Sequence, residues 1–592
     1  MNQEKRTCQN CKQSFVIEPD DFGFYERMRV PAPTFCPACR TQRRMAFRND
    51  GFLYKRKSDF SGESIFSMYS EKSPIKVYEL EAWYSDKWDP ISYGRDVDFS
   101  RPFFEQIREM FQEVPWRARG IIKPVGSEYS NNFTGFKNCY LCFNGSESEE
   151  CGYSNGLDYS KNSFDNSHIA YCELAYEGFW LTRCNTIAFS SQCEDSFNIW
   201  FSKNLRGCSN CFGCANLTNK SFCIFNRQYT KEEYEKEIQK YNLGSRSAVK
   251  MLWQRAQKFW LQFPEKFMQG AKNSRVSGNY INQSKNVFES YLVRSGEDLK
   301  SCQYLQTGPN KDCRDLTFFV GNELVYEAAQ CGDGAYNLKF CFQCWTNVKN
   351  LQYCTSCLSS SDCFGCSSLR NKQYCILNKQ YTKEEYEKLV PKIIAHMNEM
   401  PYVDEKGRKY CYGEFFPAAF SPFAYNETIA QEYFPLTKDE AAEQGYAWKD
   451  QEAKGYSVTL PVEEIVDDIK FADESILNQV IECAHEGRCN DQCTKAFRII
   501  PQELLFYKRM NLPIPDLCPN CRHFERLKRR NPIHLWHRAC QCAGTKSENG
   551  VYTNTAAHQH GAGKCTNEFE TSYSPDRPEI VYCEQCYQAE II

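Results

Sequence analysis

The sequence predicts a mostly β fold, in which two β-solenoid units, each capped by a helix, are flanked by small cysteine-rich ribbons at both ends of the chain. The first observation behind this prediction is a duplication: the stretch CFGCANLTNKSFCIFNRQYTKEEYEK at 211–236 returns at 363–388 as CFGCSSLRNKQYCILNKQYTKEEYEK. The second is the recurrence of C-x2-C pairs near both termini. Internal repeats of this kind indicate stacked structural units.

Short blocks in which Asn, Cys or Asp precedes an aromatic residue recur through the body of the chain. Tyr140, Tyr153, Phe164 and Tyr176 are spaced by 13, 11 and 12 residues. We interpret each spacing as a half-coil of about eleven residues, so that a full coil of a β-solenoid takes about 22 to 24 residues. Asn is expected at the corners, because it tolerates a left-handed backbone.

A helix is expected after each copy of the duplicated stretch. Thr230 and Glu233 form a capping box in the first copy, and Thr382 and Glu385 form one in the second. Such helices would cover the exposed last coil and prevent edge-to-edge association.

The composition favours a protein of a reducing compartment. The chain has 592 residues, a formal net charge of −3 and 35 cysteines. Its first residues, MNQEKRTCQN, are polar, and no run of about 18 apolar residues occurs, so we expect no membrane span. Metal-bound and buried thiols in the cytoplasm are therefore favoured over a disulfide framework, and the oligomeric state stays open.

The first ribbon is predicted from two cysteine knuckles, CQNC and CPAC. Cys8, Cys11, Cys36 and Cys39 can deliver four thiolates tetrahedrally to one zinc ion. Rubredoxin-like iron would use the same ligands, but zinc is favoured as the common structural choice.

The tail of the chain repeats the head. With Cys11 placed on Cys493, the residues of 15–49 match those of 497–531 at many positions, including CPAC on CPNC. The predicted ligands of this second zinc site are Cys489, Cys493, Cys518 and Cys521. Because the first knuckle is here C-x3-C, Cys483 and His485 are alternatives for the fourth ligand.

A third ribbon is predicted at 539–592. Cys565, Cys583 and Cys586 are its clear ligands, and His560 is our choice for the fourth, with His558, Cys540 and Cys542 as alternatives. The chain is therefore expected to bind two to three structural zinc ions.

A basic helix follows each of the first two ribbons, and we predict that its arginines bind nucleic acid. Arginine forks suit phosphate oxygens, and basic patches beside a ribbon are typical of nucleic-acid-binding modules. The predicted contacts are Arg40, Arg43, Arg44, Arg48, Arg522, Arg526, Arg529 and Arg530.

These residues also carry a resemblance. The pattern C-x2-C-x3-F-x-I, followed by CPACR or CPNCR, resembles the family described as the probable zinc-ribbon domain, which is widespread in bacterial proteins of unassigned function. The whole arrangement is similar to large uncharacterised cysteine-rich proteins of candidate-phylum bacteria with zinc ribbons and β-solenoids. The resemblance implies zinc binding and no particular activity.

The cysteines of the body admit two interpretations. Cys208, Cys211, Cys214 and Cys223 have the spacing of an iron–sulfur or zinc site. However, the second copy has Ser360 at the position of Cys208. We therefore favour inert thiols that stack inside the solenoid as small apolar residues.

The predicted function is a non-catalytic zinc-binding scaffold that binds structured RNA or a ribonucleoprotein, such as the ribosome, through its basic ribbons. The alternative is a protein–protein interaction scaffold that binds its partners on the solenoid faces. A minor alternative is a β-helix enzyme acting on carbohydrate, for which Asp158, Asp165, Glu173 and Glu177 are candidate carboxylates. No nucleophile or nucleotide-binding motif supports catalysis.

The expected domain order follows from these assignments. The segments are a zinc ribbon with a basic helix (1–50), an aromatic-rich packing segment (51–128), the first solenoid (129–229), cap and linker helices (230–275), the second solenoid (276–381), a cap helix with an acidic helical segment (382–482), the second ribbon with its basic helix (483–538) and the third ribbon (539–592).

Overall fold

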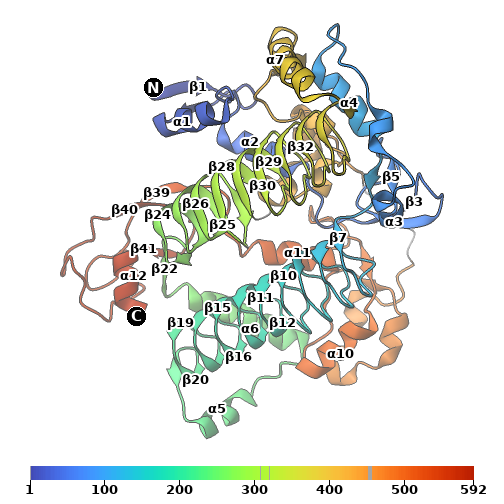
Figure 1. Cartoon of the computed structure of the whole chain (residues 1–592). Coiled ribbons are helices and arrows are strands. Elements are labelled where there is room, and N and C mark those ends of the chain that lie inside the picture. The colour runs from blue at the N-terminus through green and yellow to red at the C-terminus, as the bar shows by residue number, and fades with distance from the viewer. Residues whose placement is uncertain (1, 307, 319–320, 451–456, 592) are drawn as a thin grey trace. The chain divides into compact units, whose positions relative to one another are not determined.

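A computed structural model describes residues 2–306, 308–318, 321–450 and 457–591. The chain divides into two compact units, each assembled from separate stretches of sequence. Unit 1 comprises Met1–Arg119, Met268–Lys449 and Ile533–Leu535, and unit 2 comprises Gly120–Phe267, Asp450–Pro532 and Trp536–Ile592. Each unit contains one β-solenoid, as the sequence predicts (Figure 1).

The solenoid of unit 2 consists of two parallel sheets of short strands. One sheet has the order β19-β17-β15-β13-β11-β10-β9-β8-β7, and the other β12-β14-β16-β18-β20-β21. The strands are β7 (Ile121–Ile122), β8 (Asn131–Thr134), β9 (Phe143–Ser146), β10 (Asn155–Asp158), β11 (Ser167–Ala170), β12 (Glu173–Tyr176), β13 (Phe179–Thr182), β14 (Asn185–Ala188), β15 (Ser191–Glu194), β16 (Phe197–Trp200), β17 (Lys203–Arg206), β18 (Ser209–Phe212), β19 (Ala215–Thr218), β20 (Ser221–Ile224) and β21 (Arg227–Gln228).

One coil of this solenoid takes 12 residues. Asn155 pairs with Ser167, which pairs in turn with Phe179. The Ser154 side chain accepts a hydrogen bond from the backbone of Asn166, 12 residues further along. The expected coil of 22 to 24 residues is therefore wrong, because the spacing of the aromatic blocks marks a full coil and not half of one.

The narrow coil is produced by a period of three residues. From Asn132 to Phe222 every third residue has a positive φ, and many of these residues are Asn or Gly, as expected for a left-handed backbone. The side chains two positions before these residues point inward, and most are Ser, Cys, Leu or Ile. A 12-residue coil therefore encloses about four side chains, which explains why small residues and thiols fill it.

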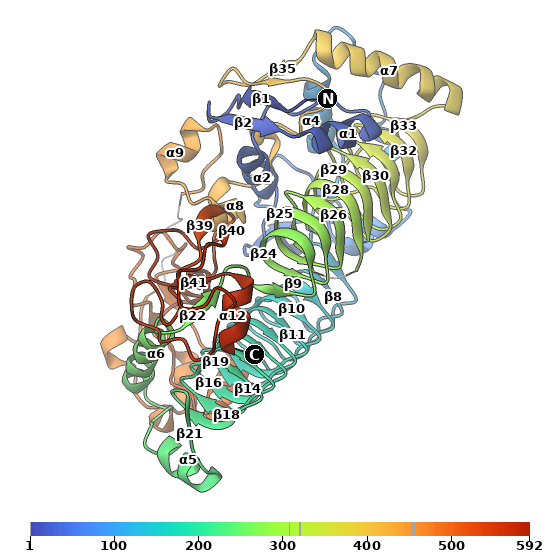
Figure 2. The same cartoon turned by 90° about the vertical axis from the view of Figure 1, so that its left-hand side faces the viewer.

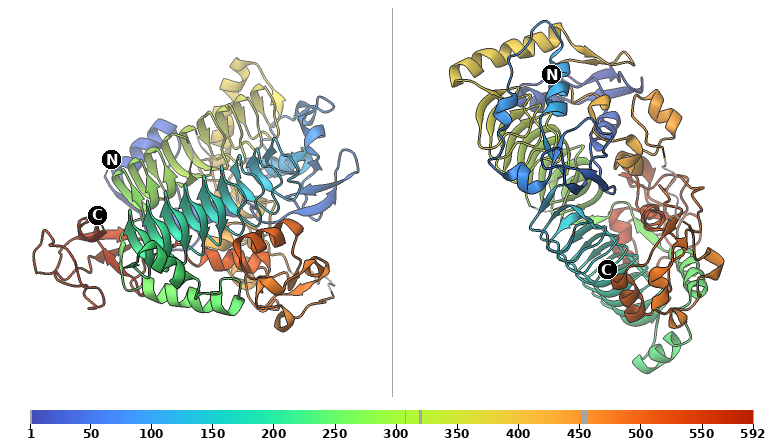
Figure 3. Two further views of the ribbon diagram at one scale, coloured as in Figure 1. Left: turned by 90° about the horizontal axis from the view of Figure 1, so that it is seen from below. Right: turned by 90° about the vertical axis from the view of Figure 1, so that its right-hand side faces the viewer.

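The solenoid of unit 1 forms one sheet with the order β23-β24-β25-β26-β28-β29-β30-β31-β32-β33-β34, and β27 pairs with β25 and β28. Its strands are β23 (Gly270–Ala271), β24 (Ser274–Asn282), β25 (Lys285–Arg294), β26 (Gly296–Lys300), β27 (Gln303–Leu305), β28 (Asn310–Thr317), β29 (Asn322–Ala329), β30 (Ala335–Lys339), β31 (Lys349–Gln352), β32 (Ser361–Phe364), β33 (Gln373–Ile376) and β34 (Lys379–Gln380). Figure 3 shows the ladder of strands within each solenoid.

The predicted capping boxes are present at both duplicated stretches. Thr230 caps α5 (Lys231–Ile238) with Glu233, and Thr382 caps α7 (Lys383–Glu399) with Glu385. In unit 2 a further helix, α6 (Arg246–Trp260), follows α5. Its buried residues Val249, Leu252, Ala256 and Trp260 join the core that covers the solenoid.

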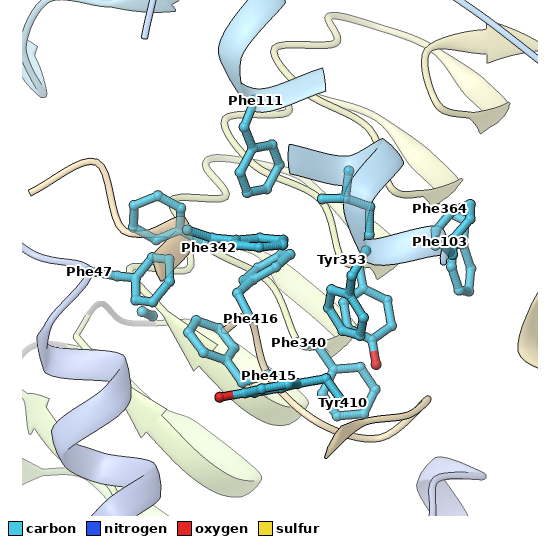
Figure 4. Packing of buried hydrophobic residues seen from close by; sticks show 14 of the residues in the cluster. Phe47, Phe103, Phe111, Phe340, Phe342, Tyr353, Phe364, Tyr410, Phe415 and Phe416 are labelled. Atoms are coloured by element: carbon cyan, nitrogen blue, oxygen red, sulfur yellow. The ribbon is translucent and has the colours of Figure 1, made fainter. Parts of the chain in front are cut away.

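The aromatic-rich segment after the first ribbon packs onto the solenoid of unit 1. It contains β3 (Tyr54–Lys57), β4 (Ser64–Ser67), β5 (Val77–Tyr78), α3 (Leu80–Tyr84), a 3-10 turn η1 (Pro90–Tyr93), α4 (Phe103–Glu113) and β6 (Trp116–Arg117). Phe103 of α4 lies edge-on to Phe364, and Trp116 contacts Phe342 (Figure 4). The predicted role of these aromatics in packing agrees with this arrangement.

The acidic segment that precedes the second ribbon is less helical than expected. Unit 1 holds β35 (Tyr402–Val403), β36 (Lys409–Tyr410), α8 (Ala430–Tyr433) and α9 (Lys438–Glu443), together with the 3-10 turns η2 (Ala418–Phe420) and η3 (Tyr425–Glu427). In unit 2 only the 3-10 turns η4 (Val462–Glu464), η5 (Ile469–Phe471) and η6 (Glu474–Asn478) occur among the described residues of 457–480. Its aromatic and proline residues instead wrap irregularly over the core.

Among the residues that the structure describes, no helix is both long enough and apolar enough to cross a membrane.

Candidate metal centres

The three cysteine ribbons share one construction. A strand ends in a cysteine, a loop with a second cysteine leads to an antiparallel strand, and a C-x2-C knuckle follows at the start of a helix. The elements are β1 (Glu4–Thr7), β2 (Ser14–Ile17), α1 (Pro19–Met28) and α2 (Pro37–Met45); β37 (Ile481–Glu482), β38 (Ala496–Phe497), α10 (Pro501–Met510) and α11 (Pro519–Leu527); and β39 (Trp536–Ala539), β40 (Glu568–Thr571), β41 (Ile580–Tyr582) and α12 (Glu584–Ile591).

The first ribbon brings together the four predicted cysteines. The ligand atoms of Cys8, Cys11, Cys36 and Cys39 lie within 4.8 Å of one another. The sulfur atoms of Cys11 and Cys36 are 3.7 Å apart, which is close to the edge of about 3.8 Å of a tetrahedron with metal–sulfur bonds of about 2.3 Å. This set could therefore hold a metal ion.

The second ribbon uses Cys483 where we predicted Cys489. The converging set is Cys483, Cys493, Cys518 and Cys521, all buried. The backbone N–H of Cys518 donates to Cys483 Sγ at 3.2 Å, just as the N–H of Cys36 donates to Cys8 Sγ at 3.3 Å.

Cys483 therefore occupies the position of Cys8 at the end of the first strand. Our assignment of Cys489 to this set is wrong, because the loop between the first two ligands is longer in the second ribbon and carries Cys489 outside the set. The alternative that we named, Cys483, is the residue that the structure places there.

The third ribbon completes its set with Cys540 instead of His560. Cys540, Cys565, Cys583 and Cys586 converge, and all four are buried. The N–H of Cys583 donates to Cys540 Sγ at 3.2 Å, which repeats the hydrogen bond of the other two ribbons. His560 is wrong as the fourth member of this set, because a cysteine at the end of the first strand fills that position.

Two further groups of ligand atoms lie beside these sets. The first is Cys542, His558, His560 and Cys586, and the second is His485, Cys489, Asp491 and Cys521. Both include the last cysteine of a knuckle, Cys586 or Cys521, which also belongs to a four-cysteine set.

Contacts within the sets favour the thiolate form that metals bind. Hydrogen bonds from Cys36 and Cys39 hold the pKa of the Cys8 thiol well below its usual range. In the third ribbon a hydrogen bond from Cys540 lowers the pKa of Cys583 to about 4.

The solenoid cysteines act as ladder residues, as we expected. Cys208 Sγ donates to the carbonyl oxygens of Arg206 and Leu217 at 3.4 and 3.3 Å. Burial raises the pKa of the Cys302 thiol to about 11, so this thiol stays protonated. Among the described residues, no solenoid cysteine belongs to a candidate metal group.

The helix behind the first knuckle inserts its arginines into the solenoid of unit 1. Arg40 donates from Nε and Nη2 to Asp315 Oδ2 at 3.0 and 2.9 Å, and Arg44 donates from Nη1 to Asp315 Oδ1 at 3.1 Å. Arg43 Nη2 donates to Glu327 Oε1 at 2.7 Å. Figure 1 shows α2, which carries these residues, beside β28 and β29.

The helix behind the second knuckle does the same in unit 2. Arg526 Nη1 donates to Asp165 Oδ1 at 3.0 Å and to Glu177 Oε1 at 2.9 Å. Arg522 Nε lies 3.2 Å from Asp165 Oδ1, and Arg529 Nη2 donates to Glu177 Oε2 at 2.6 Å. The side chain of Arg526 is fully buried.

These contacts correct the predicted role of the arginines as phosphate contacts. Of the eight arginines, seven are buried: Arg40, Arg43, Arg44, Arg48, Arg522, Arg526 and Arg530. The eighth, Arg529, is half-buried against the solenoid, and 15% of its side chain is exposed. The carboxylates of the solenoid, and not solvent, face most of these guanidinium groups, so a phosphate has no access to them in this structure.

Comparison of the sequence with models of protein families and with characterised proteins found no match. The resemblance to the probable zinc-ribbon domain therefore stays an expectation from the quoted motifs.

Sequence reasoning missed two ligands and the partners of the arginines. A signal for Cys483 and Cys540 exists, because each directly follows the first strand of its ribbon, as Cys8 does. The carboxylates Asp315 and Glu327 lie more than 270 residues from the arginines that they bind, and no local pattern marks them.

Proposed function

We propose that this protein is a non-catalytic scaffold whose three ribbons each bind one structural zinc ion through four cysteine thiolates. The observation that carries this proposal is the repeated geometry of the three sets, in which a backbone N–H donates to the first cysteine each time. Four sulfur ligands and a closed, buried site are typical of structural zinc.

Zinc binding would position the arginines. In the first two ribbons the knuckle forms the first turn of α2 or α11, so the metal ion fixes the start of the helix whose next turns carry the arginines. Each ribbon has little core of its own, and we expect zinc to supply most of its folding free energy, on the order of 10 kcal/mol. The metal sites thus hold the ribbons against the solenoids.

All 35 cysteines are free thiols in the structure. Since zinc binding requires reduced thiols, we propose that the protein works in a reducing compartment such as the cytoplasm.

RNA or ribonucleoprotein binding stays a prediction. The arginines on which it was based are engaged with carboxylates, so binding would have to use other basic residues. A direct test is the salt dependence of binding to structured RNA by the full chain.

The enzyme alternative loses two of its four candidate carboxylates. Asp165 and Glu177 both bind Arg526, so they are occupied as anchors of the second ribbon. Asp158 accepts a hydrogen bond from Ser146, and Glu173 accepts one from Asn185. This arrangement favours the scaffold.

The experiment that tests the proposal is metal analysis of the full-length protein purified without added metal. We expect at least three zinc ions per chain and the loss of about one when Cys36, Cys518 or Cys540 is replaced by Ser. Iron in place of zinc would contradict the choice of metal, and an unchanged metal content in all three variants would contradict the sites.

A further inference from the structure

We propose that the third ribbon binds a second zinc ion, held by Cys542, His558, His560 and the shared thiolate of Cys586. This inference rests on the proposed function, because the neighbouring four-cysteine set supplies the shared ligand. The result would be a two-metal cluster in which Cys586 bridges both ions.

The distances within the group suit a single tetrahedral ion. Cys542 Sγ lies 3.2 Å from His558 Nδ1, and His560 Nε2 lies 3.3 Å from Cys586 Sγ. Ligands at about 2.0 to 2.3 Å from a tetrahedral zinc ion are about 3.3 to 3.8 Å apart. All four ligand atoms lie within 4.8 Å of one another.

The hydrogen-bond partners of both histidines leave the correct ring nitrogen available. Glu590 Oε1 accepts a hydrogen bond from His558 Nε2 at 2.7 Å, and the carbonyl of Gly563 accepts one from His560 Nδ1 at 2.8 Å. Both oxygens can only accept, so these nitrogens carry the hydrogens. The lone pairs are then on His558 Nδ1 and His560 Nε2, the two atoms that face the sulfurs.

This is the arrangement that metal-bound histidines commonly have, with the second ring nitrogen held by a carboxylate or a backbone carbonyl. Glu590 is itself held in place, because it accepts hydrogen bonds from the hydroxyl of Tyr552 and the backbone N–H of Thr555, both at 2.8 Å. The side chains of His558 and Glu590 are only 1% and 0% exposed.

The sulfur of Cys542 is also prepared as a ligand. The side-chain amide of Asn554 donates to it at 3.2 Å, which stabilises a thiolate. A second Zn²⁺ would lower the net charge of the cluster, since five thiolates with two zinc ions carry −1, whereas four thiolates with one zinc ion carry −2. This reduction favours the second ion in a buried site.

Cys542, His558 and Glu590 also have the order of a nucleophile, a base and a carboxylate. However, Cys542 is 0% exposed, so a substrate has no access to its sulfur. The burial favours a closed metal site.

The position of the ligands in the ribbon supports the same conclusion. Cys542, His558 and His560 all lie in the long loop between the first two ligands, Cys540 and Cys565. The second ribbon has a shorter loop at this position, and it places His485, Cys489 and Asp491 beside its own last cysteine in a more exposed group.

The test is the zinc content of the full-length protein with both His558→Ala and His560→Ala. We expect the loss of about one zinc ion relative to wild type, with the four-cysteine sets still loaded. The matched control is His537→Ala on the same ribbon, whose side chain is 63% exposed, and it should retain every ion. An unchanged zinc content in the double variant would overturn the proposal.

A second variant guards against misfolding. His560→Cys offers a thiolate in place of the imidazole, so it should retain the ion that the double variant loses. Loss of the same ion in His560→Cys, in a protein with native circular dichroism, would contradict the role of His560 as a ligand.

The shared thiolate can be tested by cadmium substitution and NMR of the full chain. Two cadmium resonances that disappear together in Cys586→Ser, and that show coupling to each other in wild type, would support the bridge. Absence of coupling would overturn it. Failure of the proposed function is distinguishable, because Cys540→Ser would then leave the zinc content unchanged.

Discussion

The two units anchor a ribbon to a solenoid with the same chemistry but satisfy the central carboxylate differently. In unit 1 Asp315 uses both oxygens, which accept three hydrogen bonds from Arg40 and Arg44. In unit 2 the arginine contacts of Asp165 converge on Oδ1, and Oδ2 has no hydrogen-bond partner among the described residues.

This difference changes the protonation of the two carboxylates. Although burial opposes the charged form, the arginines hold the pKa of Asp315 below its usual range. Burial raises the pKa of Asp165 to about 6, and Glu177 and Glu503 nearby add to the increase. The comparison shows that the number of ion pairs does not determine the charge state; the share of each oxygen and the surrounding carboxylates do.

The third pair of each cluster also comes from different places. Arg43 in unit 1 reaches Glu327 and also Glu414 of the acidic segment. In unit 2 Arg522 binds Glu503, which belongs to α10 of its own ribbon. Unit 1 therefore ties three separate parts of the chain together, and unit 2 ties two.

The largest expected effect comes from removing a metal ligand in each ribbon. Cys36→Ser and Cys518→Ser should each remove about one zinc ion and undock the ribbon of its own unit alone, because the zinc ion supplies most of the ribbon's folding free energy, on the order of 10 kcal/mol. Limited proteolysis with mass spectrometry would locate the new cleavage sites. Cleavage in both ribbons of a single variant would show that the two units are not independent.

The choice between Cys483 and Cys489 can be tested in the same way. We expect Cys483→Ser to weaken zinc binding at the second ribbon strongly, and Cys489→Ser to leave the four-cysteine set loaded. Competition with a chromophoric chelator would measure the two affinities. A larger loss in Cys489→Ser would reverse the assignment.

Removal of one arginine from each cluster should destabilise its unit by about 3 to 5 kcal/mol, because a carboxylate is left buried without its partner. Arg44→Ala tests unit 1 and Arg526→Ala tests unit 2, with exposed Arg27→Ala and Arg488→Ala as controls. Urea unfolding monitored by hydrogen exchange in α2 and α11 would give the free energy of each unit. Equal stability of variants and controls would remove the arginines from the account.

The two carboxylates should respond to pH with opposite sign. The folded pKa of Asp165, about 6, exceeds the unfolded value of about 3.9, so its contribution makes unit 2 more stable as pH falls from 7 to 5. The pKa of Asp315 is lowered, so its contribution to unit 1 is present at both pH values and is lost only as pH falls below about 3.9.

The measurement is hydrogen exchange in α11 and α2 at pH 7 and pH 5, after correction for intrinsic exchange rates. Asp165→Asn should abolish the gain in protection of α11 at pH 5, whereas Asp315→Asn should not change the pH dependence of α2 over this range. A loss of α11 protection on acidification to pH 5 that Asp165→Asn removes would contradict the raised pKa.

The smallest effect is expected inside a solenoid. Cys208→Ser should change stability by about 1 kcal/mol or less and should not change the metal content, because a serine can make the same contact. Ser360, at the matching position of the other solenoid, donates to the carbonyl of Leu358 at 2.8 Å. Loss of a metal ion in this variant would revive the iron–sulfur or zinc interpretation of these cysteines.

The sequence contained enough to predict the β-solenoids, their capping helices and the knuckles, because these depend on local repeats and spacings. The coil length was missed because the aromatic residues mark the outside of the coil, whereas its period of three is carried by Ser, Cys, Leu and Ile on the inside. The destination of Arg44 could not be predicted, because Asp315 lies 271 residues away and only the folded chain brings them together.

The coupling between metal and arginines is the central claim, and hydrogen exchange of the zinc-loaded and metal-stripped protein tests it most directly. We expect metal removal to abolish protection in α2 and α11 and to reduce it in the solenoid coils that carry Asp315 and Asp165, while the coils around Cys208 stay protected. Unchanged protection of both helices after complete metal removal would contradict the claim that the metal ions hold the arginines in place.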